Sequence, residues 1–317
     1  MHVVVIGSGI AGLMAAQSLV ENGHDVVVVD KGHSPGGRLA TRRIDDATLD
    51  HGAQFFTVRD SLFESHVSEW ITSGVVTEWC RGFDSTTQDN DGFPRYRGVR
   101  GMTDIAKYLA QGLNVRCSTL AFSIARGATS KWQLKIDDGS VLDADAIIVT
   151  CPLPQAYALL VTADIELPES MLRTEYDRTI CLLAVLNQSS AVTKPGGLQN
   201  PDETFSFIAD NAIKGISSAV ALTMHANPQF SLEHWDTSTD DVQRLLLERA
   251  SPWIGDATVI TSQIKKWRLA TPLTIWPERY WAKDMIVLAG DAFGGPKIEG
   301  AALSGLAAAN YLQQTNE

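Results

Sequence analysis

Short apolar runs separated by turn residues dominate the beginning of the chain. The segments His2–Ile6 and Asp25–Val29 are rich in valine, which is typical of parallel strands buried on both faces. Between them, the alanine- and leucine-rich stretch Ile10–Val20 predicts a helix, and Asn22-Gly23 is a typical signal for its end. A glycine turn joins the first strand to this helix. The pattern therefore predicts a compact β-α-β unit.

Near residue 132, the continuous apolar runs are followed by a segment in which apolar and polar residues alternate. Residues Trp132–Ile136 alternate apolar and polar, Asp138-Gly139 is a turn signal, and a second strand begins at Val141, which together predict a hairpin. An apolar strand over 144–150 ends in Cys151-Pro152-Leu153-Pro154. Here we expect the prolines to stop regular structure and to mark a crossing into another region.

The middle of the chain carries further β-like runs, and its end returns to the opening pattern. The expected strands lie at 181–186, 204–208 and 218–224, with a helix near 240–250. A last strand over 285–289 leads through a glycine-rich loop into a helix from about 298 to 313. Both ends of the chain therefore read as parts of one domain.

These elements predict an α/β fold with a discontinuous Rossmann-type domain and a second, mixed α+β domain for substrate. The expected nucleotide-binding domain comprises residues 1–60, 97–155 and 281–317. The expected substrate domain comprises residues 61–96 and 156–280.

Composition narrows the class of protein. A length of 317 residues fits about two domains, and 44% hydrophobic with 20% charged residues is typical of a folded globular protein. The net charge of −11 disfavours nucleic acid as a partner, because a polyanion requires a concentrated field of Lys and Arg. An anionic ligand would need local positive charge, for which Arg42 and Arg43, or Arg95, Arg97 and Arg100, are candidates unless they form a solvated surface.

Cysteine and histidine spacing gives no support for a metal site. The four cysteines are far apart, with no CxxC pair, and no HExxH motif occurs, so we expect reduced cysteines and no metal. The first strand begins almost at once, without a basic leader, and no apolar run reaches the roughly 18 residues of a membrane span. We therefore expect a cytoplasmic protein without a membrane partner.

The first turn carries a dinucleotide signature. Gly7, Gly9 and Gly12 have GxGxxG spacing between a strand and a helix, and Asp30 follows Gly12 by 18 residues at the end of the next strand. The glycines allow a tight turn, close approach of a pyrophosphate and close helix packing, while the acid is placed to bind ribose hydroxyls. A glycine turn without a ligand is the alternative. The expected cofactor contacts here are Gly7, Gly9, Ile10, Ala11, Gly12, Asp30 and Lys31.

Two further motifs distinguish FAD from NAD. The segment KGHSPGGRLATRR, with Gly37 and Arg38, resembles the GGR motif of the flavin monoamine oxidase superfamily, in which the arginine supports the pyrophosphate and the flavin region. The segment VLAGDAFGGPKIEGAALSGLAAA resembles the returning segment of the same superfamily. A surface turn and a packed terminal helix are the alternatives. The resemblance implies noncovalent FAD, since no cysteine lies near the returning aspartate, with contacts at Gly37, Arg38, Gly290, Asp291, Gly300 and Ala301.

The segment LDHGAQFFTVRD, together with GGRLATRR before it, resembles renalases, a branch of this superfamily. The resemblance implies that Gln54 contacts the flavin near its reactive part. His51 is ambiguous between a base and a structural residue. In KKWRLATPL, Trp267 is a candidate wall of the substrate cavity or a core residue, and Arg268 is expected to be buried against an anionic partner. None of these four candidates is assigned a definite catalytic role.

The renalase resemblance implies an FAD-dependent oxidase. Its substrates would be the 2- and 6-dihydro isomers of NAD(P)H, oxidised to NAD(P)+ by hydride transfer to flavin N5, with dioxygen reduced to hydrogen peroxide. A dihydropyridine already favours hydride loss, so the protein mainly orients two rings. An amine oxidase, a desaturase and a noncatalytic flavin-binding regulator are the alternatives. No obvious pair of cage tyrosines stands near the C-terminus, which disfavours simple amines.

Overall fold

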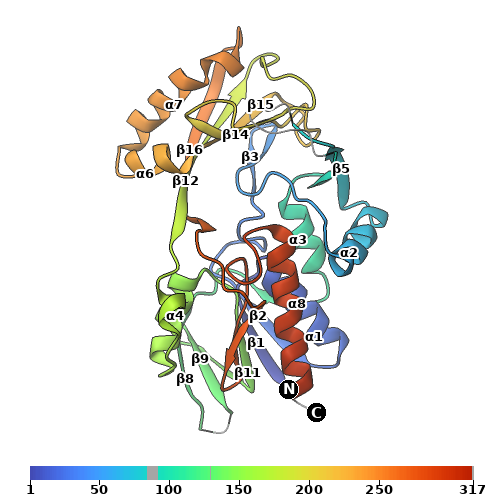
Figure 1. Cartoon of the computed structure of the whole chain (residues 1–317), viewed down its shortest axis with the longest axis vertical. Helices are drawn as coiled ribbons and strands as arrows, with labels where there is room; N and C mark the ends of the chain where they lie inside the picture. Colours follow the sequence, from blue (N-terminus) through green and yellow to red (C-terminus); the bar gives the residue numbers. More distant parts are fainter. Residues whose placement is uncertain (84–91, 129, 316–317) are drawn as a thin grey trace.

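The computed structural model describes residues 1–83, 92–128 and 130–315. Two sheets lie one above the other along the longest axis of the molecule (Figure 1). We call the six-stranded sheet with its covering helices the lower half. We call the five-stranded sheet with α6 and α7 the upper half.

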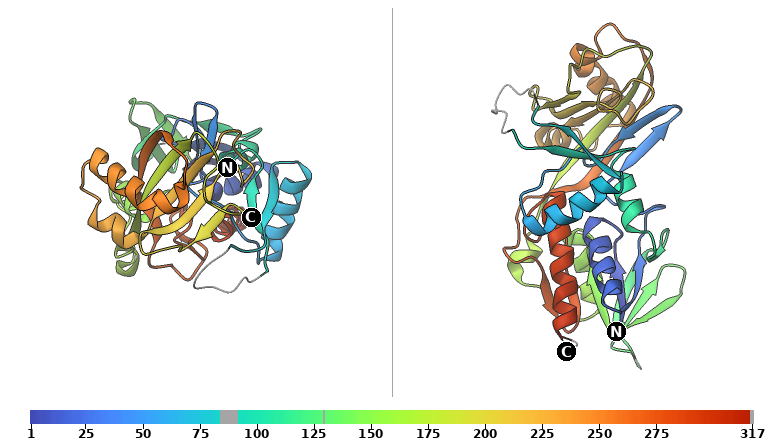
Figure 2. Two further views of the ribbon diagram at one scale, coloured as in Figure 1. Left: turned by 90° about the horizontal axis from the view of Figure 1, so that it is seen from above. Right: turned by 90° about the vertical axis from the view of Figure 1, so that its right-hand side faces the viewer.

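The lower half is built from both ends of the chain. Its strand order is β17-β18-β11-β1-β2-β7, parallel except for β17. The strands are β1 (His2–Ile6), β2 (Asp25–Val29), β7 (Asn114–Arg116), β11 (Ala146–Val149), β17 (Trp281–Lys283) and β18 (Ile286–Leu288). Helices α1 (Ile10–Glu21) and α8 (Ile298–Thr315) run side by side on one face of the sheet (Figure 2). The predicted Rossmann-type fold is thus confirmed.

Glycine allows those two helices to approach closely. A Cβ atom on Gly305 of α8 would lie 2.0 Å from the carbonyl oxygen of Ala11 in α1, so no larger residue fits there. The contact fixes the C-terminal helix against the helix that follows the first glycine turn.

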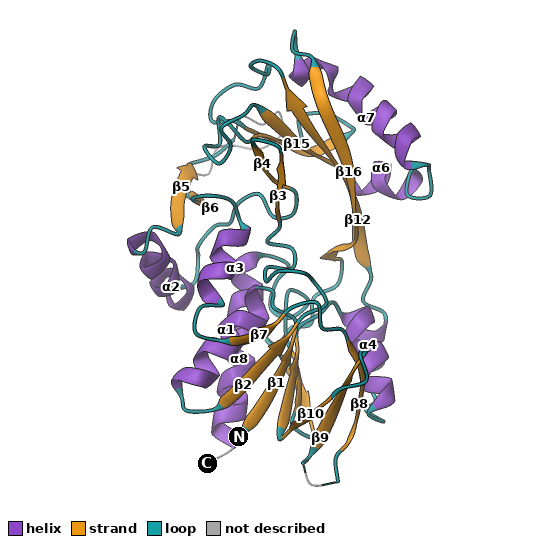
Figure 3. Cartoon of the chain, turned by 180° about the vertical axis from the view of Figure 1, so that it is seen from behind, coloured by secondary structure: helices purple, strands orange, loops and turns teal. Residues whose placement is uncertain are grey.

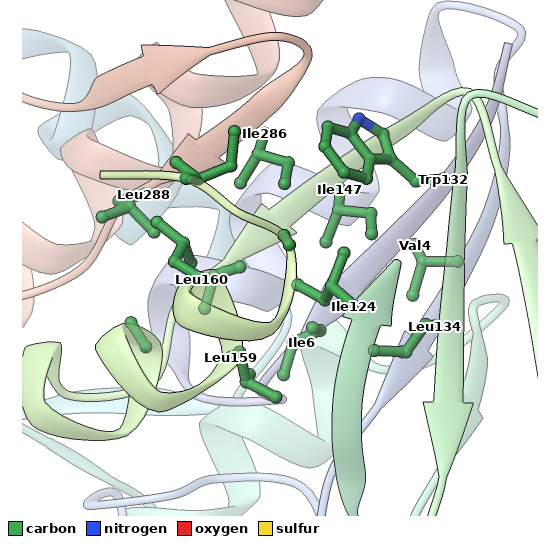
Figure 4. Close-up of a cluster of buried hydrophobic side chains, with 14 of the residues drawn as sticks. Val4, Ile6, Ile124, Trp132, Leu134, Ile147, Leu159, Leu160, Ile286 and Leu288 are labelled. Atoms are coloured by element: carbon green, nitrogen blue, oxygen red, sulfur yellow. The ribbon is translucent and has the colours of Figure 1, made fainter. Parts of the chain in front are cut away.

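The predicted hairpin forms a third layer beside the six-stranded sheet. Its strands β9 (Trp132–Ile136) and β10 (Val141–Ala144) are the predicted pair, and β8 (Ala121–Arg126) pairs with β9 as a third strand that was not predicted from the sequence. The helix α4 (Leu153–Thr162) packs against β8, and its Leu160 lies in one cluster with Trp132 of this layer and Ile147 of the main sheet (Figure 4). This cluster contains residues from the beginning, middle and end of the sequence, which explains why these segments fold together.

The prediction that prolines stop regular structure after β11 is wrong. Pro152 is the N-cap of α4, and Pro154 lies in its first turn, where a missing N–H breaks no helical hydrogen bond. The short helix α5 (Glu169–Leu172) follows, and the chain enters the upper half only at β12 (Tyr176–Leu186).

The upper half is an antiparallel sheet with the order β13-β14-β15-β12-β16. Its other strands are β13 (Gly197–Gln199), β14 (Phe205–Asp210), β15 (Ala221–Ala226) and β16 (Val259–Pro272). Helices α6 (Pro228–Glu233) and α7 (Thr239–Ile254) cover one face. The hairpin β3 (Thr41–Ile44) with β4 (Ala47–Asp50) covers the other, where Leu49 packs in a cluster with Cys181 (Figure 3).

The remaining elements lie between the two sheets. They are α2 (Ser61–Thr72), β5 (Val76–Cys80), β6 (Arg95–Gly98) and α3 (Thr103–Leu109). The division into two domains stays a prediction, but Phe63, Val67 and Trp70 of α2 share a core cluster with α1, α3 and α8 rather than with the upper sheet. In the described part of the chain, every helix is too short or too polar to traverse a lipid bilayer.

Candidate functional site

The first glycine turn leaves room for a ligand at the N-terminus of α1. Gly7 has a φ of +106°, and a Cβ atom on Gly12 would lie 1.9 Å from the Gly7 carbonyl oxygen, so both positions require glycine. A Cβ atom on Gly9 would have nothing within 4 Å. Gly9 is also the N-cap of α1 and provides no side-chain cap, so the helix presents free N–H groups to this open space. The geometry fits a pyrophosphate.

Asp30 lies directly beside this turn. Its carboxylate accepts hydrogen bonds from the backbone N–H of Ser8 at 2.6 Å, from Ser8 Oγ at 2.8 Å and from the N–H of Gly32 at 2.7 Å. These bonds hold the carboxylate at the end of β2 and leave acceptor capacity for a ribose hydroxyl. The neighbouring Lys31 has an exposed side chain whose Nζ reaches Gln155 Oε1 at 3.3 Å.

An ion pair joins the second motif to the third. Arg38 donates two hydrogen bonds to the carboxylate of Asp291, at 2.6 and 2.7 Å, and a third to the carbonyl of Ala270 at 3.0 Å. Such a bidentate pair fixes the plane of the guanidinium. Gly37, with a φ of +56°, lies against the first turn, since its Cβ would be 3.5 Å from the Cα of Gly9. The three motifs predicted from distant segments therefore meet at one place.

The returning segment is packed tightly. Gly290 has a φ of +131° and donates its N–H to Ser304 Oγ at 2.8 Å. A Cβ atom on Gly300 would lie 2.4 Å from the carbonyl oxygen of Gly295. Ala301 is buried in the first turns of α8, which begins two residues before Gly300, at Ile298. The roles of these residues toward FAD stay predictions.

Gln54 is buried in a network within the protein. Its side-chain amide donates to the carbonyls of Asp50, at 2.6 Å, and Gly52, at 3.1 Å, and its Oε1 accepts from Lys214 Nζ at 3.4 Å. The side chain thus holds the turn over residues 50–54. A direct contact with the flavin stays a prediction.

Lys214, which the sequence did not single out, forms a buried ion pair with Asp50. The Nζ to Oδ2 distance is 2.7 Å, and both side chains have 0% exposure. Burial lowers the pKa of Lys214, while the Asp50 carboxylate opposes this. The N–H of Met102 also donates to Asp50, at 2.8 Å. The pair fastens the loop after β14 to the end of β4.

His51 and Trp267 form a stacked pair beside this network. Their ring centroids are 5.3 Å apart, with an interplanar angle of 21°, and Trp267 Nε1 donates to the His51 carbonyl at 2.8 Å. Burial is the main cause that lowers the pKa of His51 to about 4, with smaller contributions from Lys265, His225 and Arg42. The imidazole is therefore neutral at neutral pH. Its Nδ1 is buried and has no hydrogen-bond partner among the described residues.

The expectation that Arg268 is buried is wrong. The residue is exposed, because successive residues of β16 point to opposite faces and Trp267 occupies the inward position. Of the two neighbouring candidates in β16, only Trp267 therefore faces His51.

Tyr176 is a further residue that the sequence did not reveal. Its hydroxyl accepts a hydrogen bond from the N–H of Leu153 at 3.2 Å. Burial raises the pKa of Tyr176 above its ordinary value, and the negative charge of Asp291 contributes. The residue therefore lies near the Arg38–Asp291 pair as a neutral phenol, but no motif surrounds it in the sequence.

Known families match almost the whole chain. Residues 5–68 match the model of an NAD(P)-binding Rossmann-like domain, and residues 65–313 match the model of a flavin containing amine oxidoreductase.

Curated relatives agree with these matches. Renalase of Mus musculus is 22% identical over 340 residues, which cover 99% of this chain and 99% of renalase. Putrescine oxidase of Kocuria rosea is 27% identical over 293 residues, or 90% of this chain and 56% of that enzyme. Hydroxyneurosporene desaturase of Rubrivivax gelatinosus is 47% identical over only 65 residues, or 20% of this chain and 12% of that protein.

A solved structure shows the same fold. Cyclohexylamine oxidase from Brevibacterium oxydans IH-35A superimposes with a TM-score of 0.75 at 14% identity, covering 100% of this chain and 99% of that one. Since the amine oxidoreductase model covers most of the sequence, this chain belongs to the family of flavin-containing amine oxidoreductases.

Proposed function

We propose that the protein is an FAD-dependent oxidase that converts the 2- and 6-dihydro isomers of NAD(P)H to NAD(P)+ and reduces dioxygen to hydrogen peroxide. The observation that carries the proposal is the neutral His51 imidazole stacked on Trp267. The match to renalase along 99% of both chains supports it. We also propose a cytoplasmic location, as expected from the sequence.

FAD is the cofactor, and three groups of residues suit it. The open N-terminus of α1 at Gly9 suits the pyrophosphate, Asp30 suits the adenosine ribose, and the Arg38–Asp291 pair suits the flavin end. Bound FAD supplies the hydride acceptor, at flavin N5, and returns the electron pair to dioxygen.

The His51–Trp267 pair suits a role in orientation. A flat, neutral surface stacks on a planar dihydropyridine without adding a charge, and it excludes water from one face of the substrate. Loss of hydride from a dihydropyridine yields an aromatic cation and leaves no proton to remove. A neutral imidazole with a depressed pKa is therefore compatible with this reaction.

Amine oxidation is the second candidate, because putrescine oxidase matches 90% of the chain. The two candidates are distinguished by mixing the FAD-loaded protein, without oxygen, with each dihydro isomer, with putrescine and with cyclohexylamine. We expect rapid loss of the oxidised flavin absorbance with at least one dihydro isomer and none with the amines. Bleaching by an amine alone would support amine oxidation, and bleaching by no compound would support a noncatalytic flavoprotein.

A further inference from the structure

Two cations near His51, Arg42 and Lys265, have no acidic partner among the residues that the structure describes. In a protein with a net charge of −11, neither Arg42 nor Lys265 forms an ion pair within the part of the chain that the structure describes. Both side chains are half-buried. Removing a charge from water without a nearby counter-ion costs desolvation free energy, which a bound anion would offset.

The backbone register brings both cations to one interface. Arg42 of β3 pairs with Leu49 of β4, so the two side chains share one face of that hairpin. Leu49 packs against Cys181 of β12, and Cys181 pairs in turn with Lys265 of β16. Both cations therefore point into the space between the hairpin and the upper sheet. Trp267 follows two residues after Lys265 on the same face.

The charge of Arg42 acts on Lys265, as expected for two side chains that lie close together. Desolvation lowers the pKa of Lys265, and the Arg42 guanidinium lowers it further. Both cations also help to lower the pKa of His51, whereas Asp50 is the acid that opposes them. Asp50 is already bound by Lys214. The local field is thus positive.

Two buried polar atoms without hydrogen-bond partners among the described residues lie in the same place. Arg42 Nε is buried and has no partner among the described residues, and His51 Nδ1 is in the same condition. Buried polar atoms normally have partners, so those without one mark a place where a ligand completes the structure. Arg43, the next residue in β3, is exposed and points to the other face of the hairpin.

We propose that Arg42 and Lys265 bind a phosphate group of the substrate, beside the ring that stacks on His51 and Trp267. A guanidinium and an ammonium together suit a phosphate, whereas they repel the ammonium of an amine substrate. The inference rests on the proposed function, because it assigns the pyrophosphate of a dihydronicotinamide dinucleotide to this pair. It also predicts that simple amines are poor substrates.

Steady-state kinetics with two substrates test the assignment. One substrate is a dihydronicotinamide dinucleotide, and the other is the corresponding dihydronicotinamide riboside, which has no phosphate. In Arg42→Gln and Lys265→Gln we expect KM for the dinucleotide to rise about tenfold, with kcat and the KM for the riboside unchanged. The matched control Arg43→Gln is expected to leave all of these values unchanged. An unchanged KM for the dinucleotide in both variants would overturn the phosphate site.

Inorganic pyrophosphate separates this inference from the proposed function. We expect it to raise the melting temperature of the FAD-loaded wild-type protein and of Arg43→Gln, and to have a smaller effect on the other two variants. If no dihydronicotinamide is oxidised but this pattern is seen, the proposed function fails and the anion site stands. If pyrophosphate acts equally on all four proteins, the anion site fails, whatever the substrate.

Discussion

The lower and upper halves of the molecule differ in whether their buried or half-buried charged side chains have ion-pair partners. In the lower half, the proposed FAD site consists of glycine backbone and the N-terminus of α1, and its charged residues Arg38 and Asp291 pair with each other. At the face of the upper half, Lys214 pairs with Asp50, whereas Arg42 and Lys265 form no ion pair with any residue that the structure describes. Under the proposed function, a phosphate group of the substrate would neutralise the positive charge of Arg42 and Lys265, whereas Arg38 is already neutralised by Asp291.

The largest effect is expected from breaking the buried pair. Lys214→Met leaves the Asp50 carboxylate buried without its counter-ion, and we expect the free energy of unfolding to fall by about 3–5 kcal/mol. Chemical denaturation measures this. The control Lys107→Met alters an exposed lysine of α3 and is expected to change stability by less than about 0.5 kcal/mol. Equal stability of the two variants would mean that the ion pair does not fasten the loop after β14 to the end of β4.

Two glycines of the first turn separate folding from cofactor binding. Gly12→Ala places a Cβ atom 1.9 Å from a carbonyl oxygen and is expected to destabilise the protein even without FAD. Gly9→Ala meets nothing within 4 Å, so the apoprotein is expected to keep its melting temperature. Because the added methyl group occupies the space assigned to the pyrophosphate, we expect FAD affinity to fall at least about tenfold. Unchanged affinity in Gly9→Ala would place the pyrophosphate elsewhere.

The pH dependence of stability probes His225, a half-buried histidine whose Nε2 lies 3.2 Å from the His51 carbonyl oxygen. Burial lowers the pKa of His225 to about 4, below its ordinary value of 6.5. As pH falls from 6.5 toward 4, the unfolded chain takes up a proton that the folded protein does not, so stability is lost in this window.

A comparison of variants isolates this contribution from that of the carboxylates. Relative to His225→Gln, we expect the wild-type protein to lose about 1–2 kcal/mol more stability between pH 7 and pH 4.5. Thermal or chemical denaturation across this range gives the two curves. Parallel curves would show that His225 titrates normally in the folded protein.

The smallest effect is expected from removing the hydrogen bond between Trp267 and His51. Trp267→Phe keeps an aromatic ring but loses the Nε1–H bond to the His51 carbonyl, which is worth about 1 kcal/mol. We expect kcat/KM for the dihydronicotinamide dinucleotide to fall about fivefold. Trp253→Phe, on the α7 side of the upper sheet, is the control and should leave kcat/KM unchanged.

The sequence predicts the lower half well because its signals are local. The bounds of β1 and β2 agree residue for residue, since continuous valine runs and a glycine turn leave few alternatives. The prediction that the prolines after β11 stop regular structure is wrong because proline, which breaks the interior of a helix, is favoured in the first turn of a helix.

The surroundings of Asp50 and Arg42 are less predictable because they depend on contacts between distant segments. Asp50 and Lys214 are 164 positions apart, and no spacing rule pairs them. Sequence alone also could not say that Arg42 is turned inward and Arg43 outward, because both readings fit an isolated hairpin. The packing of that hairpin against β12 decides which of the two arginines points toward the upper sheet.

The decisive measurement is the visible absorption spectrum of the purified protein. In the proposed site, backbone from both ends of the chain surrounds one FAD. We expect a yellow protein with flavin absorption bands, whose flavin is released into solution by heat. A colourless protein that takes up no FAD when the cofactor is added would contradict the account.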